Sequence, residues 1–176
     1  PVGIVAGLVP STNPTSTVIY KAMICLKAGN PILFSPHPSA AGCILEAVNV
    51  VRRAAESAGA PAGAIACITN PTLEATQALM RHDATRLILA TGGGAMVKAA
   101  YSSGTPAIGV GAGNGPAYIH RSADVRLAVK RILDSKTFDN GTICASEQSI
   151  VVTREMEAAV SAELKAQGAY LLSDAE

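Results

Sequence analysis

Aromatic side chains and charges are scarce in this sequence. There is no tryptophan, aromatic residues make up 3% and charged residues 15% of 176 positions, and the formal net charge is +1. This charge gives no basic footprint for nucleic acid or for an anionic membrane surface. No apolar run is long enough to span a bilayer, and no signal-peptide pattern opens the chain. We therefore expect neither nucleic acid nor a membrane among its partners.

Paired cysteines are also missing. The four cysteines, Cys25, Cys43, Cys67 and Cys144, are widely spaced, with no CxxC pair and no cysteine–histidine cluster. This spacing is not that of a disulfide framework or of a zinc site. We expect no metal, and a reducing, cytoplasmic compartment.

The apolar residues, 49% of the chain, occur in short runs that alternate with helical patterns. They are mostly alanine, valine, isoleucine and leucine, as in buried parallel strands covered by alanine-rich helices. We predict strands over residues 2–9, 31–35, 64–68, 86–90 and 106–110. Helices are predicted between them over residues 14–27, 39–57, 71–81 and 95–102. This alternation predicts right-handed βαβ units and an α/β fold with a parallel, Rossmann-like sheet.

The rhythm changes after Gly111, where we predict a domain boundary that divides residues 1–111 from residues 112–176. The second part is expected to contain an apolar run over 117–119, a helix over 123–135, a strand over 148–153 and a last helix to Gln167. The chain begins at Pro1 without methionine and ends just after a strand-like Tyr170–Leu172. We expect it to be a piece of a longer protein.

Three loops follow predicted strands at their carboxyl ends, where a parallel sheet binds ligands. They are residues 10–14, 35–38 and 91–94, the last reading TGGG before a helix. Glycines there let a backbone come close to a ligand, and a helix N-terminus favours an anion. A phosphate site and a tight turn that needs glycine for its dihedral angles explain residues 91–94 equally well.

The glycine-rich loop 109–115 does not match the GxGxxG dinucleotide fingerprint. Asn114 stands where the third glycine belongs, and no helix is predicted to follow. We interpret this loop as a hinge or crossover between domains rather than a phosphate cradle.

Cys144 is the candidate nucleophile. Cys25 lies in an apolar helix, Cys67 in a strand and Cys43 near a helix start, so these three are expected to pack as small apolar side chains. Cys144 lies in a polar, glycine-containing loop, where a thiol can ionise and act as a nucleophile. The residues alone leave a catalytic and a structural thiol both open.

The loop around this cysteine, residues 136–149, reads KTFDNGTICASEQS. It resembles the nucleophile loop of CoA-acylating aldehyde dehydrogenases, which include the propionaldehyde and acetaldehyde enzymes of bacterial microcompartments and the aldehyde half of bifunctional aldehyde-alcohol dehydrogenases. Residues 3–15 (GIVAGLVPSTNPT), 33–38 (LFSPHP) and 87–104 are similar to the same family. The resemblance covers essentially the whole chain and less than half of a family enzyme. It implies a partial nicotinamide-cofactor domain over 1–111 and the start of the catalytic domain, with the nucleophile, over 112–176.

The resemblance implies that Cys144 attacks the aldehyde carbonyl and forms a thiohemiacetal. The Asn13 side-chain amide and the Cys144 backbone N–H would then hold the oxyanion, and loss of one such donor typically costs ~10²- to 10³-fold in rate. The alternative for Asn13 is a plain helix cap before Pro14. A cap offers the side-chain oxygen and an oxyanion donor the NH₂, so the two roles compete.

The same resemblance implies a nicotinamide cofactor across the carboxyl ends of the strands. Its pyrophosphate would lie at Thr91, Gly92 and Gly93 and its adenosine ribose at Ser35, Pro36 and His37, with Thr12 and Gly111 also in contact. Hydrolytic aldehyde dehydrogenases carry a lysine where Ser35 stands. The resemblance leads us to expect NAD, and NADP stays open because no carboxylate follows the second strand to bind the ribose 2′-OH. His82 and His120 are expected at the surface.

Val110 stands where hydrolytic relatives have the glutamate that activates water. Valine cannot act as a general base, so a thioester on Cys144 would persist until a CoA thiol collects it. The expected reaction converts an aldehyde, CoA and NAD⁺ reversibly into acyl-CoA and NADH. The alternatives are that Val110 only fills a strand position in a hydrolytic enzyme, and that the chain is a non-catalytic nucleotide-binding scaffold. We expect these residues alone to be inactive, and further expect assembly into a homo-oligomer through segments outside this chain. Fusion to an alcohol dehydrogenase or packaging in a bacterial microcompartment would fit the resemblance.

Overall fold

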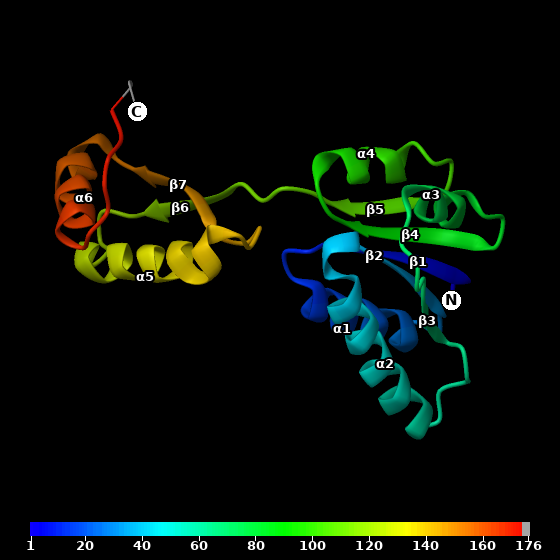
Figure 1. Cartoon of the computed structure of the whole chain (residues 1–176). Helices are drawn as coiled ribbons and strands as arrows, with labels where there is room; N and C mark the ends of the chain where they lie inside the picture. Colours follow the sequence, from blue (N-terminus) through cyan, green and yellow to red (C-terminus); the bar gives the residue numbers. More distant parts are fainter. Residues whose placement is uncertain (174–176) are drawn as a thin grey trace. The chain divides into compact units, whose positions relative to one another are not determined.

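The computed structural model describes residues 1–173 and divides into two compact units, an N-terminal unit of Pro1–Ala112 and a C-terminal unit that begins at Gly113 (Figure 1). Within the described residues, no helix is both long enough and apolar enough to cross a membrane. Each unit forms its own core and is described by itself.

The N-terminal unit is built on five parallel strands. In chain order they are β1 (Ile4–Val9), β2 (Ile32–Pro36), β3 (Ile65–Cys67), β4 (Thr85–Thr91) and β5 (Ala107–Val110). Their order across the sheet is β3-β2-β1-β4-β5, and every neighbouring pair is parallel. The chain builds outward from β1 on one side and then crosses to the other, so the topological switch point lies between β1 and β4. The predicted α/β fold with a parallel sheet is confirmed.

Helices cover both faces of this sheet. They are α1 (Pro14–Lys27), the short 3₁₀ helix η1 (Pro38–Ala40), α2 (Ala41–Ser57), α3 (Leu73–Arg81) and α4 (Gly94–Tyr101). Figure 1 shows α1 and α2 on one face and α3 and α4 on the other. Local sequence explains where they begin, since a proline opens α1 and the Thr72 hydroxyl caps α3 by accepting from the Ala75 N–H at 3.1 Å.

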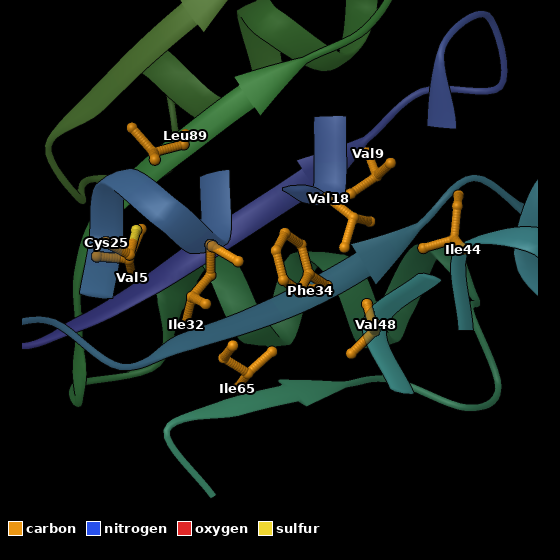
Figure 2. Packing of buried hydrophobic residues seen from close by; sticks show 11 residues of the cluster. Val5, Val9, Val18, Cys25, Ile32, Phe34, Ile44, Val48, Ile65 and Leu89 are labelled. Atoms are coloured by element: carbon orange, nitrogen blue, oxygen red, sulfur yellow. The ribbon is translucent and has the colours of Figure 1, made fainter. Parts of the chain in front are cut away.

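The largest hydrophobic cluster lies between the sheet and the layer of α1 and α2 (Figure 2). It contains Phe34 of β2, Val18 of α1 and Ile44 of α2, each completely buried. Along β1, Val5 belongs to this cluster and Ala6 to the cluster on the opposite face, as the two-residue period of a strand requires. Burial on both faces explains why the strands read as continuous apolar runs.

The C-terminal unit contains one parallel strand pair and two main helices. Its elements are β6 (Gly115–Ile119), α5 (Val125–Thr137), the 3₁₀ helix η2 (Phe138–Gly141), β7 (Glu147–Val152) and α6 (Arg154–Ala166). Ile119, Val129 and Val160, one from β6 and one from each helix, form the buried centre. This unit leads from β6 through α5 and the Cys144 loop into β7.

Three sequence-based expectations need correction. Tyr170–Leu172 does not form a strand, since within residues 1–173 the sheet of this unit consists of β6 and β7. Cys43 is exposed, because α2 turns Ile44 and Val48 toward the core and leaves Cys43 on its outer side. The 123–135 helix runs instead from Val125 to Thr137, and η2 fills part of the predicted loop. The other helices and strands lie within a few residues of their predicted ranges.

Candidate active site

Asn13 lies at the N-cap position of α1, just beyond the carboxyl end of β1. Its side chain makes no capping hydrogen bond. The Oδ1 atom accepts from the Thr12 hydroxyl at 3.1 Å, and the backbone carbonyl accepts from the Thr17 N–H at 3.2 Å. Within residues 1–173 the side-chain NH₂ makes no hydrogen bond, so it is available as a donor. The plain-cap alternative is wrong, and the oxyanion role stays a prediction.

Thr91, Gly92 and Gly93 form the turn between β4 and α4. The Gly92 N–H donates to the Val110 carbonyl at 3.1 Å, and Gly93 caps α4 with φ −64°. None of these glycines has a positive φ, and a Cβ placed on Gly93 would meet no atom within 4 Å. The turn therefore does not need glycine for its own dihedral angles. An open backbone before a helix N-terminus fits a bound pyrophosphate, and this observation favours the ligand interpretation.

The three residues predicted to contact a ribose differ in exposure. Ser35 is 4% exposed, and its hydroxyl lies 2.8 Å from the Thr76 hydroxyl of α3. Pro36 is buried at the end of β2, whereas His37 is exposed with its Nδ1 atom 2.8 Å from the Ser39 hydroxyl. Only the His37 side chain is therefore free to contact a ribose directly.

Thr12 and Gly111, the remaining predicted cofactor contacts, lie in loops. Thr12 is exposed beside Asn13, and a Cβ on Gly111 would meet nothing within 4 Å. Val110, which ends β5, is 47% exposed and so does not fill a core position. His82 and His120 are exposed, as predicted.

Lys21 is a functional candidate that the sequence interpretation missed. Its side chain is 1% exposed, and its Nζ donates to the carbonyl oxygens of Leu8 at 2.6 Å and Leu89 at 2.7 Å. Burial lowers the pKa of its amine to about 7, and the charge interaction with Cys25 opposes this only in part. The signal was its spacing, because Lys21 lies on the same helical face as Val18 and Cys25.

Cys144 lies in the turn that joins η2 to β7 and is half-buried. Before it, Asp139 and Asn140 adopt the left-handed conformation, with φ of 49° and 53°. After it, Ser146 is 1% exposed and donates from both its N–H and its hydroxyl to the Ile143 carbonyl, at 3.2 and 3.0 Å. The two Ser146 hydrogen bonds close a tight turn around Cys144 and fix the backbone that carries the thiol.

The other thiols in the chain differ in their environment. Burial raises the pKa of Cys25, and it raises the pKa of Cys67 to about 11. Both are therefore protonated near neutral pH and poor nucleophiles. Glu147 lies three residues beyond Cys144. A hydrogen bond from its own backbone N–H lowers the pKa of its carboxyl group, and a hydrogen bond from the Ser135 side chain and the positive charge of Lys136 lower it further. This keeps a carboxylate close to the Cys144 turn.

Gly113 touches the backbone of the cysteine loop. A Cβ at this position would overlap the carbonyl oxygen of Cys144 and lie 2.6 Å from its carbonyl carbon. Two backbone segments thus meet at a distance that only glycine permits. The sequence interpretation treated the 109–115 loop as a hinge and missed this contact.

The model of the "Aldehyde dehydrogenase family" matches residues 1–172, nearly the whole chain. The chain belongs to the aldehyde dehydrogenase family. The resemblance read from the motifs is confirmed.

Several relatives of this family member are closely similar. A probable aldehyde dehydrogenase from Listeria monocytogenes is 68% identical with a TM-score of 0.92, over 100% of this chain and 39% of that one. An acetylating aldehyde dehydrogenase from Geobacillus thermoglucosidasius is 62% identical with a TM-score of 0.90, over 99% and 39%. The bifunctional aldehyde-alcohol dehydrogenase AdhE of Escherichia coli K12 is 54% identical over 176 residues, 100% of this chain and 20% of that protein. The chain thus spans a fifth to two-fifths of these relatives.

More distant relatives have been solved with ligands. A propionaldehyde dehydrogenase from Rhodopseudomonas palustris, 35% identical with a TM-score of 0.88 over 99% of this chain and 40% of that one, holds CoA and an acylated cysteine. An engineered glycolyl-CoA reductase, 36% identical with the same TM-score over 99% and 40%, holds NADP⁺. Proteins of this fold therefore bind both CoA and a nicotinamide dinucleotide.

A Gly113→Ala substitution is expected to displace the Cys144 backbone, because no side chain can rotate away to relieve a clash with a carbonyl group. Overpacking of this kind costs about 1–3 kcal/mol. In the full-length protein that carries these residues, we expect displacement of the Cys144 backbone to lower the rate of NADH formation from an aldehyde about tenfold, which corresponds to a rise of about 1.4 kcal/mol in the activation free energy. Gly115→Ala is the matched control, because a Cβ there makes only an ordinary contact at 3.6 Å. Equal rates for both variants would contradict the prediction.

A second prediction concerns the pH dependence of stability. The unfolded chain keeps Lys21 protonated up to its ordinary pKa of 10.5, whereas the folded chain releases that proton near pH 7. Between these values the unfolded state binds more protons, so rising pH stabilises the folded state, by up to about 1.4 kcal/mol per pH unit. The measurement is urea unfolding of wild type and Lys21→Met at pH 6, 7, 8 and 9. We expect the free energy of unfolding of the wild type to rise by about 2–3 kcal/mol relative to that of the variant between pH 7 and 9. If the difference between the two unfolding free energies stays constant over this range, the prediction is wrong.

Proposed function

We propose that this chain supplies the cofactor-binding and nucleophile-bearing parts of a CoA-acylating aldehyde dehydrogenase. The N-terminal unit would contribute the Thr91–Gly93 turn and the Asn13 amide, and the C-terminal unit the Cys144 thiolate. The observation that carries the proposal is Cys144 on a backbone turn fixed by Ser146 and Gly113, in a sequence similar to relatives that act on aldehydes and CoA.

In the proposed reaction Cys144 is the nucleophile and Asn13 is an oxyanion donor. The Cys144 thiolate attacks the aldehyde carbon, and the Asn13 NH₂ and the Cys144 N–H donate to the oxyanion of the thiohemiacetal. A nicotinamide cofactor bound at the Thr91–Gly93 turn would supply the hydride acceptor. The oxyanion collapses to a carbonyl as the hydride leaves the same carbon, and this single step leaves a thioester on Cys144. A CoA thiolate attacks the thioester, and acyl-CoA and the Cys144 thiolate are released.

Val110 supports transfer to CoA over hydrolysis. Val110 is the last residue of β5 and is 47% exposed, and its side chain carries no group able to accept a proton. A thioester without a neighbouring base reacts slowly with water and persists for the stronger thiolate nucleophile. NAD is the proposed cofactor on the family resemblance alone, because η1 carries neither a carboxylate for the ribose 2′-OH nor a basic residue for a 2′-phosphate.

The first test is the CoA requirement of NADH formation. Full-length protein carrying these residues, or a chimera in which this chain replaces the matching segment of the Geobacillus enzyme, is mixed with a short aldehyde and NAD⁺. We expect sustained NADH formation only when CoA is present, and a loss of ~10³-fold or more in Cys144→Ala. Cys43→Ala is the matched control, because that thiol is exposed on α2 and is expected to leave the rate unchanged.

Two outcomes would favour other functions. NADH formation that ignores CoA would identify a hydrolytic enzyme. Alkylation of Cys144 no faster than that of Cys43, together with no NADH at all, would identify a non-catalytic nucleotide-binding scaffold.

The second test asks whether a carboxylate at position 110 changes the reaction from acyl transfer to CoA into hydrolysis. Val110→Glu places a carboxylate at the exposed end of β5, where it needs no burial. We expect this variant to form NADH and free carboxylic acid without CoA, at least tenfold faster than wild type under the same conditions, because the carboxylate activates water. Val110→Gln is the control, since it has the same shape and accepts no proton. Equal CoA-independent rates for both variants would contradict the role given to Val110.

A further inference from the structure

Lys21 bridges the two strands that flank the topological switch point. Leu8 belongs to β1 and Leu89 to β4, and the Lys21 Nζ donates to both carbonyls at 2.6 and 2.7 Å. In the sheet these strands are neighbours with Leu8 opposite Ala90, so the amine joins them near their carboxyl ends. This is where an open α/β sheet holds its ligand.

Tyr20, the preceding residue of α1, makes a second contact with the end of β4. Its hydroxyl lies 3.3 Å from the Thr91 hydroxyl. Thr91 is the last residue of β4 and is followed directly by Gly92 and Gly93. Two consecutive side chains of α1 thus hold the end of the strand that carries this turn.

The chemistry of Lys21 argues against a role in packing alone. A buried amine loses its hydration, which costs several kcal/mol unless its donors are satisfied, whereas methionine would fill the same volume without that cost. A neutral amine still has two N–H groups, which equals the number of carbonyls it contacts. The bridge therefore survives loss of the proton, and its geometry does not depend on the charge.

We propose that Tyr20 and Lys21 are positioning residues for the nicotinamide cofactor, holding the Thr91–Gly93 turn at a fixed distance from the end of β1 and from Asn13, which follows it. This inference rests on the proposed function, since it assigns that turn to the cofactor. Neither side chain needs to touch the cofactor, because both act through β4. We call Tyr20 and Lys21 together the clamp.

The test compares Tyr20→Phe and Lys21→Met with Lys27→Met, which removes an exposed lysine from the same helix. Binding of NADH to the full-length protein, followed by nucleotide fluorescence without turnover, gives the first readout. We expect the dissociation constant to rise about tenfold in Lys21→Met and about threefold in Tyr20→Phe, and to stay within twofold in Lys27→Met. Wild-type binding in both clamp variants would overturn the proposal.

A second readout separates positioning from general damage. Transfer of an acyl group from acyl-CoA to Cys144, followed by mass spectrometry without any nucleotide, is expected to stay within threefold of wild type in every variant. An equal loss of acyl transfer and of nucleotide binding would show a merely structural role and would also overturn the proposal. If Lys21→Met does not fold, Tyr20→Phe decides, because it keeps the ring and removes only the hydroxyl.

Activity tests the proposed function, and nucleotide binding tests the positioning role of Tyr20 and Lys21. A wild-type protein that binds NADH but forms none from aldehyde and CoA contradicts the proposed function, and the binding titration still tests the clamp. A wild-type protein with CoA-dependent activity and unaffected clamp variants contradicts only the clamp.

Discussion

A buried amine between two parallel strands is the constraint around which the N-terminal unit is organised. Lys21 has almost no exposed surface, so the free energy of removing it from water must be offset by its bonds to Leu8 and Leu89. Those bonds form only if α1 lies directly over the junction of β1 and β4. The same helix begins at Asn13 and buries Val18 and Cys25, so apolar packing and the polar bridge require one helix position.

Glycine has two different uses in the candidate site. At Gly93 the φ angle suits any residue and the space beside the backbone is empty, so glycine leaves the helix N-terminus open to a ligand. At Gly113 the space is filled by the backbone of Cys144, so glycine allows two chain segments to touch. The first use bears on the proposed ligand site, and the second bears on how firmly the Cys144 backbone is held. Sequence patterns do not distinguish the two, because both appear as glycine in a loop.

Much of the fold could be predicted because local signals agree with the tertiary structure. The α1 range was predicted to the residue, since a proline opens it and a glycine-asparagine pair follows it. Contacts between distant residues could not be predicted. Nothing in the sequence pairs Ser35 with Thr76, which are 41 positions apart, or brings Gly113 to Cys144. Lys21 was missed because lysine is rarely buried, and its apolar-face spacing conflicts with its charge.

The thiols of the chain differ in a way that bears on the chemistry. Cys25 is buried in the apolar core and Cys67 is partly buried against it, and burial raises the pKa of both thiols and leaves them protonated. Cys144 alone combines partial exposure with a backbone fixed on both sides, by the Ser146 bonds and by Gly113. A thiol that must first attack a carbonyl and then release an acyl group to a second thiol needs both access and a fixed position. Packing in or against the core restricts access to Cys25 and Cys67, whereas Cys43 is exposed but lies within the helix α2. The environment of each cysteine, more than its chemistry, therefore separates the candidate nucleophile from the others.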